Sequence, residues 1–188
     1  ANKIITCGEG GAILTNNKSI ASRARVLRDH GMSKIKRYYH LDLGYNYRMT
    51  NLQAAVGLAQ MEKLKEILSI RKKQLQKYYE LLGNHKNIKL RDFKPWTEEV
   101  HWLMTLKINS TKSNRNVIKY MKSKNVECRP MIMPVFKAKH LNKKFNPKEY
   151  QLSQSISNNY FHLPSSTGLT DKDIKHISSL IIDFADNN

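Results

Sequence analysis

The spacing of apolar residues predicts one long helix near the middle of the chain. From Thr50 to Gly83, apolar residues recur every three or four positions, which is typical of a helix with a buried face. Thr50 and Gln53 form a capping box at its start, and Gly83 ends it. A helix of roughly 30 residues is about 45 Å long. That exceeds the diameter of a small domain, so we expect it to bend near Ser69 or to span two domains.

Shorter elements flank this helix. Before it, residues 4–7 and 12–15 favour strands around a glycine-rich turn, which predicts a hairpin, and a helix over 19–30 and an irregular loop over 32–49 follow. After residue 100, strands alternate with helices, which predicts a small α/β or α+β layer. Its expected strands cover 101–108, 126–129 and 160–163, and its expected helices cover 114–124, 147–158 and 170–185.

The charge first suggests a nucleic-acid partner. The 188 residues include 33 Lys and Arg against 15 Asp and Glu, for a net charge of +18, and the basic run 34–37 precedes Tyr38 and Tyr39. The other basic runs, 71–73 and 143–144, are short, and no helix-turn-helix, RRM or zinc-finger pattern is present. We interpret most of the charge as solvated surface and keep a basic nucleic-acid-binding module as an alternative.

Several further classes do not fit the sequence. No run of about 18 apolar residues is present, as a membrane-spanning helix requires, and no secretory signal is visible. Cys7 and Cys128 are far apart, which fits a reducing compartment, and we expect a cytoplasmic protein. The seven histidines show no metal-ligand spacing, so no metal site is expected.

The start of the chain holds two candidate features whose spacing leaves their role open. The turn Gly8-Glu9-Gly10-Gly11 lacks the spacing of a dinucleotide fingerprint and of a P-loop, so it first indicates a turn with positive φ. Lys3, just before it, is either a solvated charge or an amine that forms a Schiff base.

Longer motifs narrow these alternatives. The run Asn2-Lys3-Ile4-Ile5-Thr6, the glycine turn after it, and above all residues 44–55 (GYNYRMTNLQAA) form an ordered set. Residues 25–32, His101-Trp102, Arg129-Pro130 and 163–166 extend that set over essentially the whole chain. It resembles the DegT/DnrJ/EryC1/StrS family of sugar aminotransferases, which depend on pyridoxal 5'-phosphate (PLP).

The resemblance implies an α/β fold, the C-terminal part of a fold type I PLP-dependent transferase. Residues 1–60 would be a remnant of the large PLP-binding domain, 61–85 the continuation of the long connecting helix, and 86–188 a small C-terminal α/β domain. Family members are much longer, so the chain resembles a C-terminal half that needs a missing N-terminal half. An inactive truncated fragment is the other alternative.

The resemblance also assigns roles to single residues. Lys3 would hold PLP as a Schiff base and then move a proton during transamination, and Asn46 would contact the cofactor phosphate of the neighbouring subunit. Arg48 would bind the donor carboxylate or the nucleotide diphosphate, and His101 and Arg129 would line the substrate cleft. These roles imply a homodimer with shared active sites.

The reaction that follows from the resemblance is transfer of an amino group to a keto-sugar nucleotide. The expected acceptor is an NDP-4-keto-6-deoxyhexose and the expected donor is glutamate. Surface-polysaccharide or deoxyaminosugar biosynthesis would use such a product, and neither a membrane nor a nucleic acid would take part.

Overall fold

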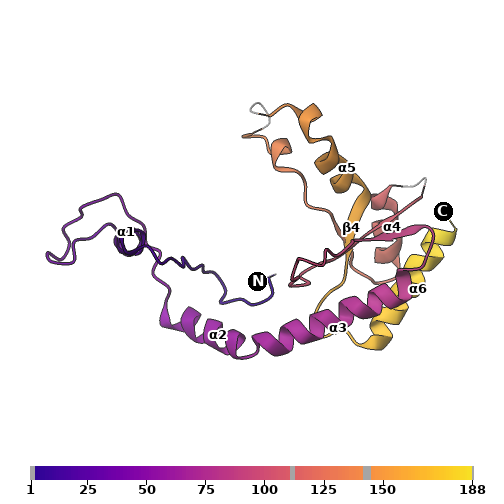
Figure 1. Cartoon of the computed structure of the whole chain (residues 1–188), viewed down its shortest axis with the longest axis horizontal. Helices are drawn as coiled ribbons and strands as arrows, with labels where there is room; N and C mark the ends of the chain where they lie inside the picture. The colour runs from indigo at the N-terminus through magenta and orange to yellow at the C-terminus, as the bar shows by residue number, and fades with distance from the viewer. Residues whose placement is uncertain (1–2, 111–112, 142–144, 188) are drawn as a thin grey trace. The chain divides into compact units, whose positions relative to one another are not determined.

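The computed structural model describes residues 3–110, 113–141 and 145–187 (Figure 1). Asn2 of the lysine motif and the basic run 143–144 therefore lie outside the described residues. The chain forms two compact units, Ala1–Lys65 and Glu66–Asn188, here called unit 1 and unit 2.

Unit 1 contains two helices and a long connecting loop. Helix α1, Lys18–Arg28, begins after Asn17, whose side chain accepts hydrogen bonds from the first backbone N–H groups. Helix α2, Asn51–Glu62, begins with the predicted capping box of Thr50 and Gln53. The loop between the helices is irregular, as predicted, apart from two isolated bridges, one of which joins Asp29 to Asn46.

The expected hairpin near the start of the chain was wrong. Residues 4–7 and 12–15 form no strand, because a strand needs a neighbour for its backbone groups and the described part of unit 1 offers none. The turn itself is present. Gly8 has a φ of +83°, and its N–H donates to Thr6 Oγ1 at 3.1 Å.

The long helix is interrupted at Lys63 rather than bent near Ser69. Lys63, with φ −92° and ψ 0°, separates α2 from α3, Leu64–Leu82. Ser69 lies inside α3, so no bend lies there. The other expectation is confirmed, because α3 begins in unit 1 and continues into unit 2. Apolar spacing shows which side of a helix faces inward, but one non-helical residue barely disturbs that spacing. Gly83 follows the last residue of α3, as predicted.

Unit 2 is built on a four-stranded antiparallel sheet with the order β1-β2-β4-β3. The strands are β1 (Ile88–Leu90), β2 (Met104–Ile108), β3 (Arg129–Pro130) and β4 (Tyr160–Leu163). The strand expected over 126–129 was misplaced, because only Arg129 and Pro130 pair with β4. Proline has no N–H to donate, which suits the edge position of β3.

Helices complete unit 2. Besides α3, they are α4 (Asn114–Ser123), α5 (Gln151–Asn159) and α6 (Asp171–Asp186), with short 3-10 turns η1 (Val135–Lys137) and η2 (Pro147–Tyr150). The helix expected over 147–158 thus begins as the 3-10 turn η2. The capping box of Thr170 and Asp173 at the start of α6 is present, as predicted.

The core of unit 2 lies between the sheet and its helices. In β2, Met104, Leu106 and Ile108 are buried, and the residues between them are half-buried, which confirms the predicted alternation. These side chains join a cluster that α3, α4, α6 and the other strands also supply. Its fully buried members include Tyr78, Leu82, Leu106, Met121, Phe161, Ile174 and Ile181.

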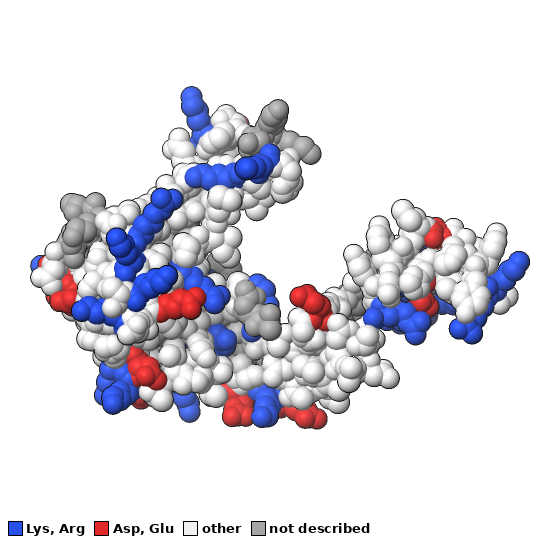
Figure 2. Space-filling view, turned by 180° about the vertical axis from the view of Figure 1, so that it is seen from behind, with Lys and Arg blue, Asp and Glu red and all other residues white. Residues whose placement is uncertain are grey.

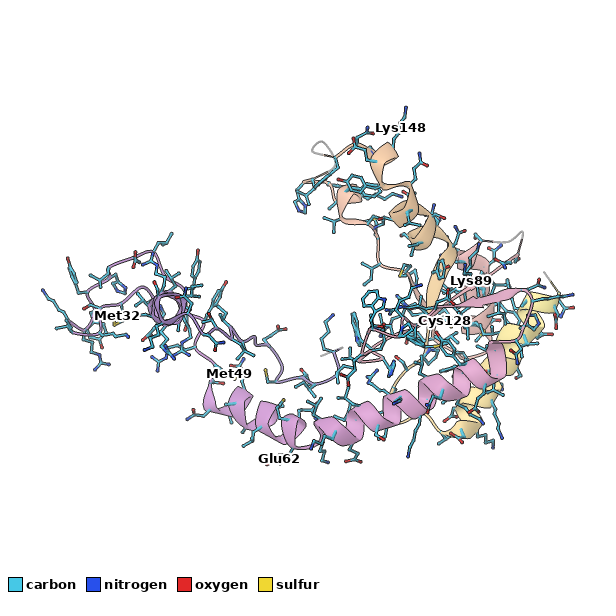
Figure 3. All side chains as sticks on the ribbon, in the orientation of Figure 1. Met32, Met49, Glu62, Lys89, Cys128 and Lys148 are labelled. Carbon is cyan, nitrogen blue, oxygen red and sulfur yellow. The ribbon has the colours of Figure 1, made fainter. Side chains whose placement is uncertain are left out.

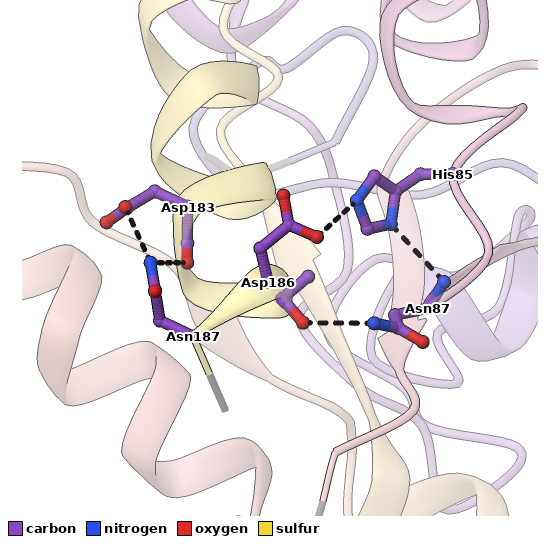
Figure 4. A network of polar contacts seen from close by, with 6 residues as sticks. His85, Asn87, Asp183, Asp186 and Asn187 are labelled. Carbon is purple, nitrogen blue, oxygen red and sulfur yellow. Dashed lines mark hydrogen bonds and ion pairs between the residues drawn. The ribbon is translucent and has the colours of Figure 1, made fainter.

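A polar network ties the start of β1 to the end of α6 (Figure 4). His85 Nε2 lies 3.1 Å from Asp186 Oδ1, and the Asn87 N–H donates to His85 Nδ1. Asn87 also donates from its side chain to the Ala185 carbonyl at 3.2 Å. Polar contacts therefore join the segment before β1 to the end of α6, in addition to the apolar core of unit 2.

Unit 1 has no comparable core. Among its described residues, only Gly31 is buried. Apolar residues surround the whole circumference of α2, and Leu52, Leu58 and Met61 are 82%, 63% and 54% exposed. A helix that is apolar on every side is normally enclosed within a larger protein.

Candidate active site

The loop that carries Asn46 and Arg48 is fastened to the end of α1. Tyr45 N–H donates to the Leu27 carbonyl at 2.7 Å, and Tyr47 N–H donates to the Arg28 carbonyl at 3.0 Å. The last carbonyls of a helix lack partners inside the helix, and this loop supplies them. The backbone on both sides of Asn46 is therefore fixed.

Two glycines allow the loop to approach this helix end. A Cβ added to Gly44 would lie 1.9 Å from the Gly31 nitrogen, and one added to Gly31 would lie 2.0 Å from the Asp42 carbonyl oxygen. Gly31 also has a φ of +66°, which favours glycine. No other residue fits either position without moving the loop.

Asn46 and Arg48 themselves are exposed. Asn46 forms the backbone bridge to Asp29, and Arg48 Nη1 lies 3.4 Å from Asp29 Oδ1. The Arg48 side chain is 64% exposed, so this ion pair is weak and its guanidinium can bind another anion. The rings of Tyr45 and Tyr47 stack with centroids 5.2 Å apart.

The segment that begins with exposed Lys3 lies against the start of α2. Gln53 Nε2 donates to the Glu9 carbonyl at 3.3 Å, and a Cβ on Gly57 would lie 3.4 Å from Cys7 Cβ. Met49 is labelled in Figure 3 where the loop enters α2. A Cβ added to Gly10 would lie 3.0 Å from Met49 Cε. The lysine segment and the Asn46–Arg48 loop thus both reach the first turns of α2.

His101 and Arg129 belong to unit 2. His101 precedes β2 with a φ of +47°, and its Nδ1 is buried without a hydrogen-bond partner among the described residues. Burial lowers the pKa of His101. Arg129 is exposed on the edge strand β3, opposite His162 on β4.

His162 is the residue that sequence reasoning missed. It is only 5% exposed, and its Nδ1 lies 2.9 Å from Thr105 Oγ1. Burial, reinforced by the positive charge of Arg129, lowers the pKa of His162. The sequence feature that could have indicated a buried histidine is its position inside an otherwise apolar, β-prone run of four residues.

Charge and metal chemistry add little to this site. On the face seen in Figure 2, Lys and Arg are scattered over the surface and interspersed with Asp and Glu. The described residues contain no group of His, Cys, Asp and Glu suited to a metal ion. None of the described helices combines the length and apolar character needed to cross a membrane.

The comparisons with known proteins agree with this architecture. The model of the DegT/DnrJ/EryC1/StrS aminotransferase family matches residues 1–181, and the chain belongs to this family. It has the α/β fold of part of a fold type I PLP-dependent transferase.

Individual relatives are similar over nearly all of this chain. GDP-perosamine synthase from Caulobacter vibrioides is 34% identical over 182 residues, which cover 94% of this chain and 48% of the relative. The solved structure of Helicobacter pylori PseC, an aminotransferase of pseudaminic acid biosynthesis, superposes with a TM-score of 0.87 at 18% identity, covering 98% of this chain and 51% of that one. Spr1654 from Streptococcus pneumoniae, solved in a PLP form, superposes with a TM-score of 0.82 at 18% identity. The match covers 94% of this chain and 46% of that one.

The coverage is as informative as the similarity. The chain spans about half the length of the curated relatives it matches. The matched relatives are therefore about twice as long as this chain.

Proposed function

We propose that this chain is the part of a PLP-dependent sugar-nucleotide aminotransferase that holds the cofactor covalently. The family match over residues 1–181 is the observation that carries the proposal. Within that match, Lys3 is an exposed residue on a segment fastened to α2, and Asn46 is an exposed residue on a loop fastened to α1. A primary amine and an amide N–H are the groups that an aldehyde and a phosphate require, so these residue types fit PLP.

Lys3 and Asn46 each have a defined task in the proposed reaction. When bound, PLP supplies an electron sink for the charge that develops on the amino donor. Lys3 would hold the cofactor through its amine and would take the proton from the donor's α-carbon. Asn46 would donate to a phosphate oxygen of the cofactor in the neighbouring subunit, and the protein would then be a homodimer with shared sites.

The substrates follow from the relatives and from the exposed cation. We infer a keto-sugar nucleotide as acceptor, with an NDP-4-keto-6-deoxyhexose as the specific case, and glutamate as donor. The Arg48 side chain is exposed enough to bind the donor carboxylate or the diphosphate through its guanidinium, and His101 and Arg129 would line the substrate cleft. The product would serve surface-polysaccharide or deoxyaminosugar biosynthesis in the cytoplasm.

The proposal also explains why unit 1 exposes so much apolar surface. Residues 1–60 are the end of the large PLP-binding domain, 61–85 continue the connecting helix, and 86–188 form the small domain. The half that the relatives possess in addition would cover α2 and supply the group that pairs with the pyridine nitrogen. Activity therefore requires that half.

The lysine assignment is testable by chemical trapping. The chain is mixed with a polypeptide that corresponds to the other half of its relatives, PLP is added, and borohydride reduces any Schiff base. Mass spectrometry should find a pyridoxyl group on Lys3 and none in the Lys3→Ala variant, whereas the exposed-site control Lys63→Ala should label normally. Absence of the adduct on Lys3 in the wild-type mixture would overturn the assignment.

A further inference from the structure

Unit 2 contains a cavity that the proposed reaction leaves unexplained. Its volume is about 260 Å³, and it lies between α3, the segment 91–103, β2 and β4. Pockets for drug-sized molecules measure about 300–1,000 Å³, so this one suits a single ring system rather than a whole sugar nucleotide. The lining residues that matter here are Tyr79, Phe93, His101, Trp102, Thr105 and His162.

Aromatic rings form one wall of the cavity. The rings of Tyr79 and Phe93 lie 5.2 Å apart, and the His101 ring meets Phe93 edge-on at 5.8 Å. The Tyr79 hydroxyl donates to the Arg91 carbonyl, and burial raises the pKa of Tyr79 to about 12, so this ring stays neutral. The planes of Tyr79 and Phe93 are inclined by 34°, so a planar ligand would stack on one of these two rings.

Two imidazole nitrogens on the lining are left without partners. His162 is only 5% exposed, and its Nδ1 is hydrogen-bonded to Thr105 Oγ1. Its Nε2 has no hydrogen-bond partner among the described residues. Nδ1 of His101 is also buried and has no hydrogen-bond partner in the described part of the chain. Burial lowers the pKa of both rings, so each is neutral at pH 7 and can donate or accept one hydrogen bond. Leaving such a group unsatisfied is costly, and a ligand with matching groups would remove that cost.

The charges on the lining cancel each other. Arg91 and Glu99 are its charged residues, and Arg91 Nη2 lies 2.5 Å from Glu99 Oε1. The Arg91 guanidinium also lies 5.9 Å from the centre of the Phe93 ring. No unpaired charge is left for a phosphate or a carboxylate, so the ligand is a neutral ring.

We propose that this cavity binds the purine or pyrimidine base of a nucleotide. A base is flat enough to stack on Tyr79 or Phe93, and its edge carries donors and acceptors in one plane for His101 and His162. A pyranose ring offers hydroxyls but no aromatic face. The identity of the nucleotide as the sugar nucleotide acceptor rests on the proposed function, whereas the cavity itself needs neither Lys3 nor PLP.

Calorimetric titration of the full chain tests the proposal. Guanosine and uridine are the base-containing probes, and glucose is the probe without a base. We expect saturable binding of at least one nucleoside and none of glucose at the same concentration. His101→Asn, which suits the positive φ, should weaken nucleoside binding about tenfold through loss of a hydrogen bond. The exposed-site control His176→Gln should bind as the wild type does.

Further variants keep the result decisive. Should His101→Asn fail to fold by circular dichroism, Phe93→Leu removes the stacking surface instead and should weaken binding similarly. Lys3→Ala should bind nucleosides normally, so failure of the lysine assignment and failure of the cavity assignment give different results. Tighter binding of glucose, no binding of either nucleoside, or equal affinity in the cavity variant and its control would overturn the proposal.

Discussion

At the scale of single residues, Gly31 and Gly44 decide where Asn46 and Arg48 lie. The two backbones approach so closely that a methyl group at position 44 would overlap the Gly31 nitrogen. This contact lets Tyr45 and Tyr47 donate to the end of α1. The position of the candidate phosphate ligand therefore depends on residues that have no side chain.

Gly44→Ala should release this loop from α1. The added Cβ cannot be accommodated at 1.9 Å, so the hydrogen bonds of the Tyr45 and Tyr47 amides should break. Hydrogen exchange of these two amides should accelerate by at least about tenfold. Gly11→Ala is the control, since a Cβ there meets nothing within 4 Å. Unchanged exchange in Gly44→Ala would contradict the close approach.

We expect His162 to make the stability of unit 2 dependent on pH. Its pKa in the folded chain is lowered from 6.5, so below pH 6.5 the unfolded chain binds more protons than the folded chain. Stability therefore rises with pH up to about 6.5 and is lost as the pH falls toward the lowered value.

The variant His162→Gln should flatten this dependence. Free energies of unfolding from urea titrations between about pH 7 and pH 5 should fall less steeply than in the wild type. The exposed His176→Gln is the matched control and should keep the wild-type slope. An unchanged slope in His162→Gln would show that other groups cause the dependence.

At the scale of elements, α6 combines a strong start signal with a buried face. Thr170 accepts from the Asp173 N–H, and the Asp173 carboxylate accepts from the Thr170 N–H at 2.8 Å. The hydroxyl and backbone of Thr170 also lower the pKa of Asp173, which keeps that carboxylate charged at the helix start. Ile174, Ile177 and Ile181 then point into the core.

Thr170→Ala should destabilise unit 2 by about 1 kcal/mol, the usual cost of losing an N-cap side chain. The measurement is urea unfolding followed by circular dichroism. Thr167→Ala, in the exposed turn just before α6, should change the free energy of unfolding by less than about 0.5 kcal/mol. Equal effects of both substitutions would argue against the capping box.

Sequence patterns predicted the elements of unit 2 better than those of unit 1. The alternation in β2 and the capping boxes at Thr50 and Thr170 are local features, and all three are present. The hairpin was wrong because strand formation depends on a neighbour outside the local sequence. The break at Lys63 and the burial of His162 escaped notice because neither changes the apolar period.

At the scale of the whole molecule, the chain spans about half the length of its curated relatives and has one unit with a core and one without. Motifs were enough to predict the family, because GYNYRMTNLQAA and the lysine segment occur in order along the chain. Roles of Lys3, Asn46, Arg48, His101 and Arg129 stay predictions. In the proposed function they depend on a cofactor and on residues outside this chain.

Exposed apolar residues on α2 should make this chain self-associate when it is alone in solution. The double variant Leu52→Glu and Leu58→Lys should reduce both binding of a hydrophobic dye and the rise of sedimentation coefficient with concentration. Ser69→Glu with Gln76→Lys, at exposed positions of α3, introduces the same charges as a control and should leave both readouts unchanged. A double variant on α2 that associates as strongly as the wild type would exclude this surface.

The burial of Cys128 has a practical consequence for spectroscopy. Desolvation raises the pKa of its thiol to about 12, so almost none of it is the reactive thiolate at neutral pH. Cys7, less deeply buried on the lysine segment, is the other cysteine of the chain. A maleimide fluorophore or spin label will therefore attach at Cys7, four residues from Lys3, without any engineered cysteine. Under the proposed role of Lys3, its emission or line shape would report on the arrival of PLP.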